Sequence, residues 1–183
     1  MKLKEGMRGK NNDLLKLIDD LPVGIIMAEV GCYAGESTLM FLQSEKIKKL
    51  FAIDPWDISY FEYDNDLSKE GNKREKRTYN NIKWAEDSFD YRIKEYENIV
   101  VKLKMTLKVA SVDLPELDFI YIDGSHLYKN VMKDIILAKE LIKVKGIIAG
   151  HDYRDFPGVI KAVNQIFGTP DKFYPDSSWI IRL

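Results

Sequence analysis

Short, continuously apolar runs alternate along the chain with longer segments whose apolar residues recur at helical spacing. Runs such as 25–30 and 117–122 lack the polar alternation of half-exposed strands, so we read them as strands buried on both faces. Segments such as 128–144 carry apolar residues three and four positions apart, the spacing of one helix face. The alternation predicts an α/β fold: a doubly wound, Rossmann-like and mostly parallel sheet with helices on both faces.

The predicted order begins with a helix and ends in an antiparallel hairpin. We expect helices at 11–21, 36–47, 77 or 84 to 97, 128–144 and 158–167, and strands at 25–30, 50–54, 99–105, 117–122, 147–149, 172–174 and 178–183. Alternate lysines in 99–105 are typical of an edge strand, whereas 117–122 should be central. No linker or internal repeat interrupts the pattern, so we expect residues 1–183 to form one domain.

Residues 57–77 break the alternation. Residues 60–64 are aromatic and acidic, and residues 69–77 are mostly charged. A long irregular insertion of this kind is typical of a substrate loop or lid over a binding site, and a solvated loop without a role is the alternative.

The first apolar run is followed by a glycine-bounded loop. Glu29 precedes Gly31, and the next helix is expected to begin after Gly35, so backbone N–H groups and a helix N-terminus meet at one point. Tyr33 stands where a dinucleotide-binding loop has its second glycine, which argues against a pyrophosphate and for a nucleoside cofactor without phosphates. Asp54, which ends the next strand, is placed to hold the hydroxyls of a ribose.

Further polar residues follow the last two parallel strands. If strands 117–122 and 147–149 are neighbours, Asp123 and Asp152 can share a divalent cation such as Mg²⁺, and His151 is a further candidate ligand. His126, three residues after Asp123, is a candidate general base. Each residue alone could have a purely structural role, as a helix cap or as a hydrogen-bond partner of a loop. Because all of them are expected at one edge of the sheet, we interpret the set as a functional site.

Composition sets limits on the partners. The 183 residues are 45% hydrophobic and carry a formal net charge of −1, so nothing drives the chain toward nucleic acid or an anionic membrane. Residues 1–10 are basic but lack the apolar core of a signal peptide, and no apolar run reaches the roughly 20 residues of a membrane span. The single cysteine, Cys32, suits the cytoplasm and is expected to be a buried loop residue rather than a nucleophile.

Several stretches together carry a family likeness. They are 28–38, 52–56, 117–128 with its Asp123-Gly124-Ser125-His126 motif, 146–153 and 157–159. The likeness spans about residues 24–167, and residues 178–181 share it as well. In these stretches the sequence resembles class I S-adenosylmethionine-dependent methyltransferases. More narrowly, it resembles small Asp-Gly-x-His proteins related to metal-dependent macrolide sugar O-methyltransferases.

The resemblance implies a role for each candidate residue. At the cofactor it places Glu29, Gly31 and Ser37 on the methionine end, Asp54 on the ribose, and Trp56, Met105 and Thr106 around the adenine, with Tyr33, Gly35 and Asp123 completing the site. It makes Asp123 and Asp152 metal ligands and His126 the base; the departure is His151, where the metal-dependent relatives carry an acid. The implied reaction is methyl transfer to a hydroxyl oxygen of a small molecule or sugar.

Two other functions stay open at this point. One is a nucleotide-binding module with a different cofactor, and the other is a catalytically idle scaffold that keeps the fold. Because the chain shows no separate substrate domain, the acceptor would be held by residues 57–77 and neighbouring loops, or by a second subunit of a homo-oligomer.

Overall fold

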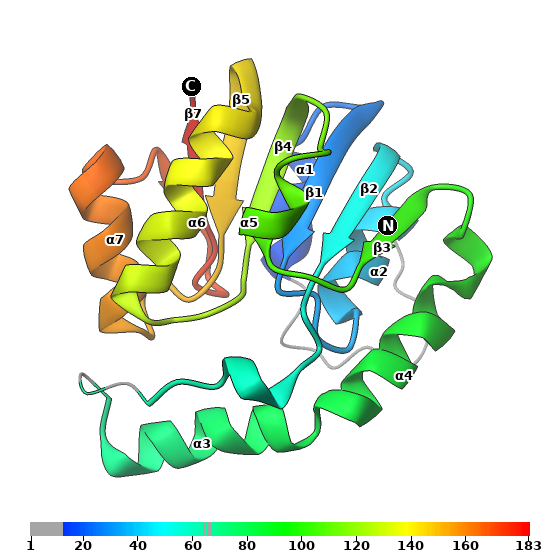
Figure 1. Ribbon diagram of the computed structural model, residues 1–183. Helices are drawn as coiled ribbons and strands as arrows, with labels where there is room; N and C mark the ends of the chain where they lie inside the picture. Colours follow the sequence, from blue (N-terminus) through cyan, green and yellow to red (C-terminus); the bar gives the residue numbers. More distant parts are fainter. Residues whose placement is uncertain (1–12, 64, 66) are drawn as a thin grey trace.

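The computed structural model describes residues 13–63, 65 and 67–183 and contains a mixed sheet with helices on both faces (Figure 1). Within the described residues its seven strands are β1 (Ile25–Val30), β2 (Ile47–Ile53), β3 (Val100–Leu103), β4 (Leu117–Ile122), β5 (Ile142–Gly150), β6 (Lys172–Phe173) and β7 (Trp179–Arg182). Their order is β3-β2-β1-β4-β5-β7-β6. Strands β1 to β5 are parallel, and β7 pairs antiparallel with both β5 and β6.

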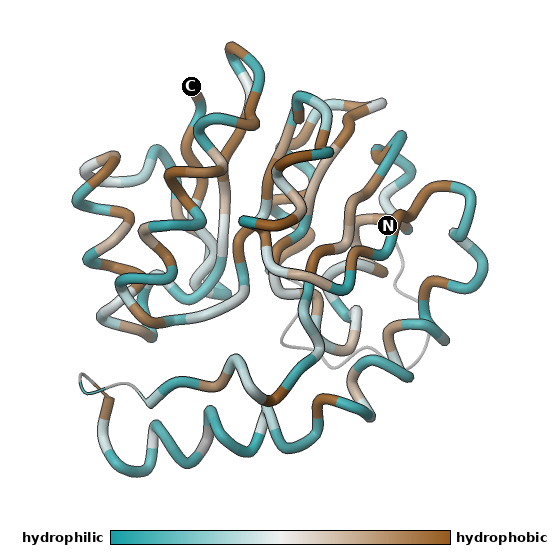
Figure 2. Tube along the Cα trace, viewed as in Figure 1, coloured by the Kyte–Doolittle hydropathy of each residue, from teal (hydrophilic) through white to brown (hydrophobic). Residues whose placement is uncertain are grey.

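The helices are α1 (Leu14–Asp19), α2 (Glu36–Gln43), α3 (Lys69–Asn80), α4 (Ile82–Ile93), α5 (Leu107–Ala110), α6 (Tyr128–Leu141) and α7 (Pro157–Phe167), with the 3₁₀ turns η2 (Ile58–Tyr60) and η3 (Lys94–Tyr96). Those that pack on the sheet form two layers. One core cluster joins the sheet to α1, α2 and α4 through side chains such as Phe41 and Phe89, and the other joins it to α5, α6 and α7 through Ile135 and Val163. Burial on both faces accounts for the apolar runs, which Figure 2 shows along the strands.

The structure confirms the predicted fold class. Strand β3, with Lys102, is an edge strand, β4 lies in the middle of the sheet, and the C-terminal strands form the predicted hairpin. The strand order reverses between β1 and β4, and at such a reversal the loops after neighbouring strands diverge and leave a crevice for a ligand.

Several predicted boundaries are wrong. The helix predicted at 36–47 ends at Gln43, and the segment from Ile47 is already strand β2. The helix predicted at 128–144 ends at Leu141, because residues 142–150 form the long strand β5, whose Val144 is 92% exposed. An apolar residue at a helix end carries the same pattern as one at a strand start, so spacing alone does not separate them.

The insertion is more regular than predicted. Residues 69–77 belong to α3, which begins where Ser68 accepts a hydrogen bond from the Gly71 amide at 3.0 Å. Lysine, arginine and glutamate are good helix formers, and they outweigh the glycine inside the helix. Figure 1 shows α3 running beneath the carboxyl ends of the strands, at a distance from the sheet.

The predictions for residues 1–10, and the first residues of the helix predicted at 11–21, lie outside the described residues. Among the residues that are described, no helix has the length and apolar character needed to cross a membrane.

Candidate active site

The loop between β1 and α2 is shaped by two glycines with positive φ, Gly31 at 86° and Gly35 at 79°. A Cβ on Gly31 would lie 2.2 Å from the carbonyl oxygen of Asp123, so only glycine lets the loop pass the end of β4. Gly35 caps the start of α2, and Cys32 between them is buried, as predicted. The predicted loop therefore forms where β1 and β4 separate.

Glu29 is fully buried at the end of β1. Its two carboxylate oxygens accept hydrogen bonds from the hydroxyls of Ser37 at 2.5 Å and Thr38 at 2.6 Å. Burial outweighs these two bonds and raises the pKa of Glu29 to about 8. Of the residues predicted at the methionine end, Gly31 and Ser37 line the cavity described below, whereas Glu29 holds Ser37 in place. A direct contact of Glu29 with the cofactor stays a prediction.

Asp54 organises the ends of β1 and β2. Its carboxylate accepts the Tyr33 amide at 2.9 Å and the Trp56 amide at 2.7 Å. Burial raises the pKa of Asp54, and the backbone bonds oppose that effect only in part. Because each carboxylate oxygen has a second lone pair, Asp54 can still accept ribose hydroxyls from the cavity that it lines.

The predicted adenine residues divide into two groups. Met105 and Thr106 line the cavity together with Tyr33. The Trp56 ring is only 4% exposed, packs on Phe89 at 4.9 Å between centroids, and donates its Nε1–H to the Tyr33 carbonyl at 2.8 Å. Trp56 therefore supports the loop between β1 and α2 (residues 31–35, the predicted cofactor loop) through the Tyr33 carbonyl. Its ring does not line the cavity described below.

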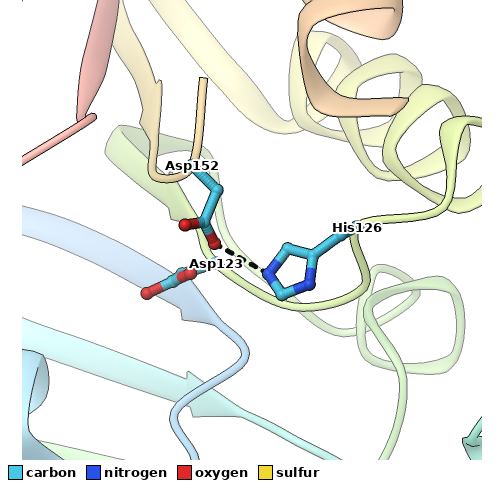
Figure 3. Close-up of side chains that lie close together, drawn as sticks. All are labelled: Asp123, His126 and Asp152. Carbon is cyan, nitrogen blue, oxygen red and sulfur yellow. Dashed lines mark ion pairs between the residues drawn. The ribbon is translucent and has the colours of Figure 1, made fainter. Parts of the chain in front are cut away.

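The candidate catalytic residues meet where β4 and β5 end, as Figure 3 shows for three of them. Ile122 and Gly150 pair in register, so the residues that follow each strand become neighbours. His126 Nε2 lies 2.7 Å from Asp152 Oδ2, and His151 Nδ1 lies 3.1 Å from Asp152 Oδ1 and 3.9 Å from Asp123 Oδ1. The structure thus brings both predicted acids and both predicted histidines together.

Charge pairing dominates this group. Burial alone would lower the pKa of His126, but its bonds to Asp152 and Glu75 outweigh burial and raise the pKa to about 10. The same balance raises the pKa of His151 to about 9 and holds that of Asp152 well below its usual range. Asp123 lacks such close partners, so burial raises its pKa. The neighbouring carboxylates thus favour the protonated form of both rings.

Helix α3 reaches this group through Glu75, whose Oε2 lies 2.8 Å from His126 Nδ1. The segment before α3 makes a second contact, between Glu62 and Lys129 at 2.5 Å, and its Phe61 ring meets Tyr79 edge-on. Glu75 and Tyr79 are not among the residues predicted for the site. Their spacing was the available signal, because positions four apart lie on one helix face, and both residues line the cavity.

One cavity of about 1450 Å³ connects the cofactor loop with the acids and histidines. Its lining includes Gly31, Tyr33, Ser37, Asp54, Tyr60, Glu75, Tyr79, Met105, Thr106, Asp123, His126, His151 and Asp152. The space admits two ligands at once, since a typical small-molecule site occupies about 300–1,000 Å³.

The donor set suits a divalent cation. Among the described residues, Asp123, His126 and Asp152 each offer a ligand atom, and these atoms lie within 4.8 Å of one another. The set contains the two predicted carboxylates, with His126 in place of the predicted His151. Two carboxylates and one imidazole fit a transition metal such as Mn²⁺ as well as Mg²⁺ completed by water.

Comparison with known proteins agrees with this architecture. A sequence-family model described as a methyltransferase domain matches residues 28–153. The uncharacterized protein R132 of Acanthamoeba polyphaga mimivirus is 29% identical over 141 residues, which cover 75% of this chain and 57% of that protein. The chain thus spans little more than half the length of this curated relative.

Solved methyltransferases share the fold. The O-methyltransferase NovP superposes with a TM-score of 0.63 at 18% identity, over 87% of this chain and 72% of NovP. The O-methyltransferase TomG from Streptomyces achromogenes, solved in complex with S-adenosylmethionine, gives 0.60 at 13% identity, over 96% and 80% of the two chains. The fold and the glycine loop are thus those of a class I S-adenosylmethionine-dependent methyltransferase. The chain belongs to the methyltransferase-domain family, because the family model matches most of the chain, residues 28–153.

Proposed function

We propose that this chain transfers a methyl group from S-adenosylmethionine to a hydroxyl oxygen of a small molecule or sugar. The observation that supports this most is the cavity of about 1450 Å³, which extends from Asp54 to the base candidate His126. Two of the solved proteins with this fold are described as O-methyltransferases, which is consistent with the proposal.

The reaction asks little covalent chemistry of the protein. An acceptor oxygen attacks the methyl carbon in line with the sulfonium; the C–O bond forms, the C–S bond breaks, and the sulfonium leaves as the neutral sulfide of S-adenosylhomocysteine. The protein has to align the partners at about 3 Å and remove the hydroxyl proton.

His126 is the proposed proton acceptor. Its Nδ1 is occupied by Glu75 and its Nε2 by Asp152, at 2.8 Å and 2.7 Å. The hydroxyl therefore has to take the place of the Asp152 oxygen at Nε2 and meet a neutral ring. Asp152 lines the same cavity, so the acceptor can reach this position.

We propose that a divalent cation activates the acceptor hydroxyl. Asp123 and Asp152 would hold it; because His126 is the proposed base, the nearby imidazole would be that of His151. Bound there, a cation would lower the pKa of the acceptor hydroxyl. The protein's own contribution is to keep the two carboxylates together at the ends of β4 and β5.

The cavity lining suits a polar acceptor. Two tyrosines, Tyr60 and Tyr79, line the cavity together with Glu62 and Asn130. Rings that stack on a sugar face, beside groups that accept and donate hydrogen bonds, are a fitting surface for a polyhydroxylated compound.

Cofactor binding is tested first. Isothermal titration calorimetry with S-adenosylhomocysteine should show binding, and NAD under the same conditions should show none. Binding of NAD alone would support the nucleotide-binding alternative and remove the methyltransferase assignment for this site.

Turnover is tested with methyl-labelled S-adenosylmethionine and a panel of sugars, phenols and amines, with products identified by mass spectrometry. With an accepted hydroxyl compound, His126→Ala should lower turnover by about 10²- to 10⁴-fold, the usual share of general base catalysis, and leave S-adenosylhomocysteine affinity nearly intact. Normal turnover by this variant would exclude His126 as the base, and methylated amines alone would exclude O-methyl transfer.

Metal assistance is tested on the same reaction. Activity that EDTA abolishes and Mg²⁺ or Mn²⁺ restores supports the cation. Turnover that is insensitive to the chelator would leave a metal-free site in which protonated His151 neutralises the acids.

A further inference from the structure

We propose that Glu75, on the helix that runs beneath the carboxyl ends of the strands, is the positioning residue for His126. It would fix the imidazole ring so that Nε2 faces the acceptor. The proposal deepens the proposed function, since it rests on His126 acting as the base. It adds a residue from a segment 51 positions away in the sequence that no catalytic motif includes.

The ring of His126 is held from three directions. Glu75 Oε2 meets Nδ1 at 2.8 Å, Asp152 Oδ2 meets Nε2 at 2.7 Å, and Phe156 stacks on the ring face with centroids 3.9 Å apart and planes 16° from parallel. The backbone is fixed as well, because a Cβ on Gly158 of α7 would lie 2.3 Å from the His126 carbonyl oxygen. Only Asp152 among these contacts lies where an acceptor hydroxyl has to bind, so the others can persist during the reaction.

Glu75 differs from its neighbours on α3. The charged side chains of Lys73 and Glu70 are 71% and 75% exposed and pair with each other at 3.5 Å. The Glu75 side chain is 21% exposed and turns toward the site. A carboxylate taken partly out of water is destabilised unless it is paired, and here its partner is the imidazole of the candidate base.

The chemistry of the pair sets the tautomer. A carboxylate only accepts hydrogen bonds, so Nδ1 has to carry the proton that it donates to Glu75. Asp152 draws a proton to Nε2 in the same way, so Nε2 can accept a proton only after an acceptor hydroxyl has displaced Asp152 and the ring is neutral. The lone pair is then on Nε2, because Glu75 keeps the proton on Nδ1. The carboxylate also stabilises the imidazolium that results, as the buried acid of a hydrolase triad does for its histidine.

The second contact of this segment allows positioning to be separated from docking. Glu62 binds Lys129 at 2.5 Å, and the Lys129 side chain is 61% exposed. Lys129 is not among the residues that line the cavity. Removing the Lys129 charge therefore loosens the segment, whereas removing Glu75 frees the ring. The matched control for charge is Glu70→Gln, on the same helix.

The first experiment needs no acceptor. The chain has two histidines, so in a His151→Gln background the ring N–H signals in a long-range ¹H–¹⁵N spectrum belong to His126. We expect a slowly exchanging Nδ1–H signal that Glu75→Ala abolishes and that both Glu70→Gln and Lys129→Gln retain. A signal that survives in Glu75→Ala would overturn the proposal, and calorimetry with S-adenosylhomocysteine on each variant checks that the site is folded.

The second experiment uses the acceptor found by the product screen. Glu75→Ala should lower kcat by about 10- to 100-fold, the usual effect of removing the partner that orients a histidine, with KM for S-adenosylmethionine unchanged. Glu75→Gln, whose amide oxygen can still accept from Nδ1–H, should recover part of that loss. An equal loss of kcat in Lys129→Gln would show that docking alone matters and overturn the positioning role. Wild-type protein that binds no S-adenosylhomocysteine would instead contradict the proposed function.

Discussion

Glu29→Gln provides a test of the cofactor loop that needs neither cofactor nor acceptor. Glu29 is fully buried, and its oxygens bind only the hydroxyls of Ser37 and Thr38 among the hydrogen bonds that the structure records. Glutamine has nearly the same shape, and its amide can accept from one hydroxyl and donate to the other. The substitution therefore removes the ionisable proton and leaves the packing in place.

The expected effect follows from the raised pKa. Burial lifts the pKa of Glu29 from 4.5 to about 8, so between these values the folded chain holds a proton that the unfolded chain has released. The contribution of Glu29 to the free energy of unfolding is fully present below pH 4.5 and is lost as the pH rises toward 8. At pH 7, which is about 2.5 pH units above 4.5, the loss is about 3 kcal/mol at about 1.4 kcal/mol per unit.

Glutamine has no proton to lose, so the variant should be about 3 kcal/mol more stable than the wild type at pH 7 and about equal to it at pH 4.5. For a chain of this size the difference at pH 7 corresponds to a rise in Tm of about 6–12 °C.

Thermal and urea unfolding of both proteins at pH 5 and pH 7.5 measure the difference. Glu36→Gln is the control, because it makes the same charge change at the first residue of α2, just after the loop, with a side chain that is 55% exposed. Its effect should be small at both pH values. If the stability of Glu29→Gln relative to the wild type were the same at pH 5 and pH 7.5, the reasoning would be refuted. The folded state would then hold Glu29 ionised without a loss of stability.

Three further predictions concern the cofactor site and the segment over it. Asp54→Ala should weaken S-adenosylhomocysteine binding by about 1.5–3 kcal/mol in calorimetry, the worth of hydrogen bonds to a charged group, and an unchanged affinity would remove the ribose role. Gly31→Ala should destabilise the fold far more than Gly24→Ala in urea unfolding: both have positive φ, but a Cβ meets Asp123 only at Gly31 and nothing within 4 Å at Gly24. Residues 57–77 should exchange amide hydrogens more slowly with S-adenosylhomocysteine and acceptor bound than without them, and equal rates would contradict a lid.

The parts of the fold that could be predicted are those in which one pattern dominates. Strand β4, with the run Leu117–Ile122, is buried on both faces, so its residues leave a continuous apolar signal. Once β4 and β5 are taken as neighbours, the meeting of Asp123 and Asp152 follows from the geometry of parallel strands, and the register of Ile122 with Gly150 shows this.

The parts that could not be predicted depend on which way a side chain turns. Trp56 follows a strand end as an adenine residue would, yet its left-handed backbone, with φ of 42°, goes with a ring that is buried against Phe89. Glu75 sits among lysines and arginines that make α3 look like a solvated face, and Figure 2 shows this helix as hydrophilic along its length. The contact between Glu75 and His126 depends on where α3 lies in the folded chain, and the sequence pattern does not give that position.

The site divides at the point where the strand order reverses. The ends of β1, β2 and β3 supply the loop at Gly31, Asp54 and Met105, and the ends of β4 and β5 supply Asp123 and Asp152. The two halves touch where Gly31 passes the Asp123 carbonyl, the contact that leaves no room for a Cβ. Because β1 and β4 are hydrogen-bonded neighbours, this contact would fix the distance between a cofactor held by one half and an acceptor held by the other, as the proposed function requires. Under that proposal, alignment of the reacting groups is a property of the sheet itself, and the proposed lid would only have to close over a site whose two halves are already in register.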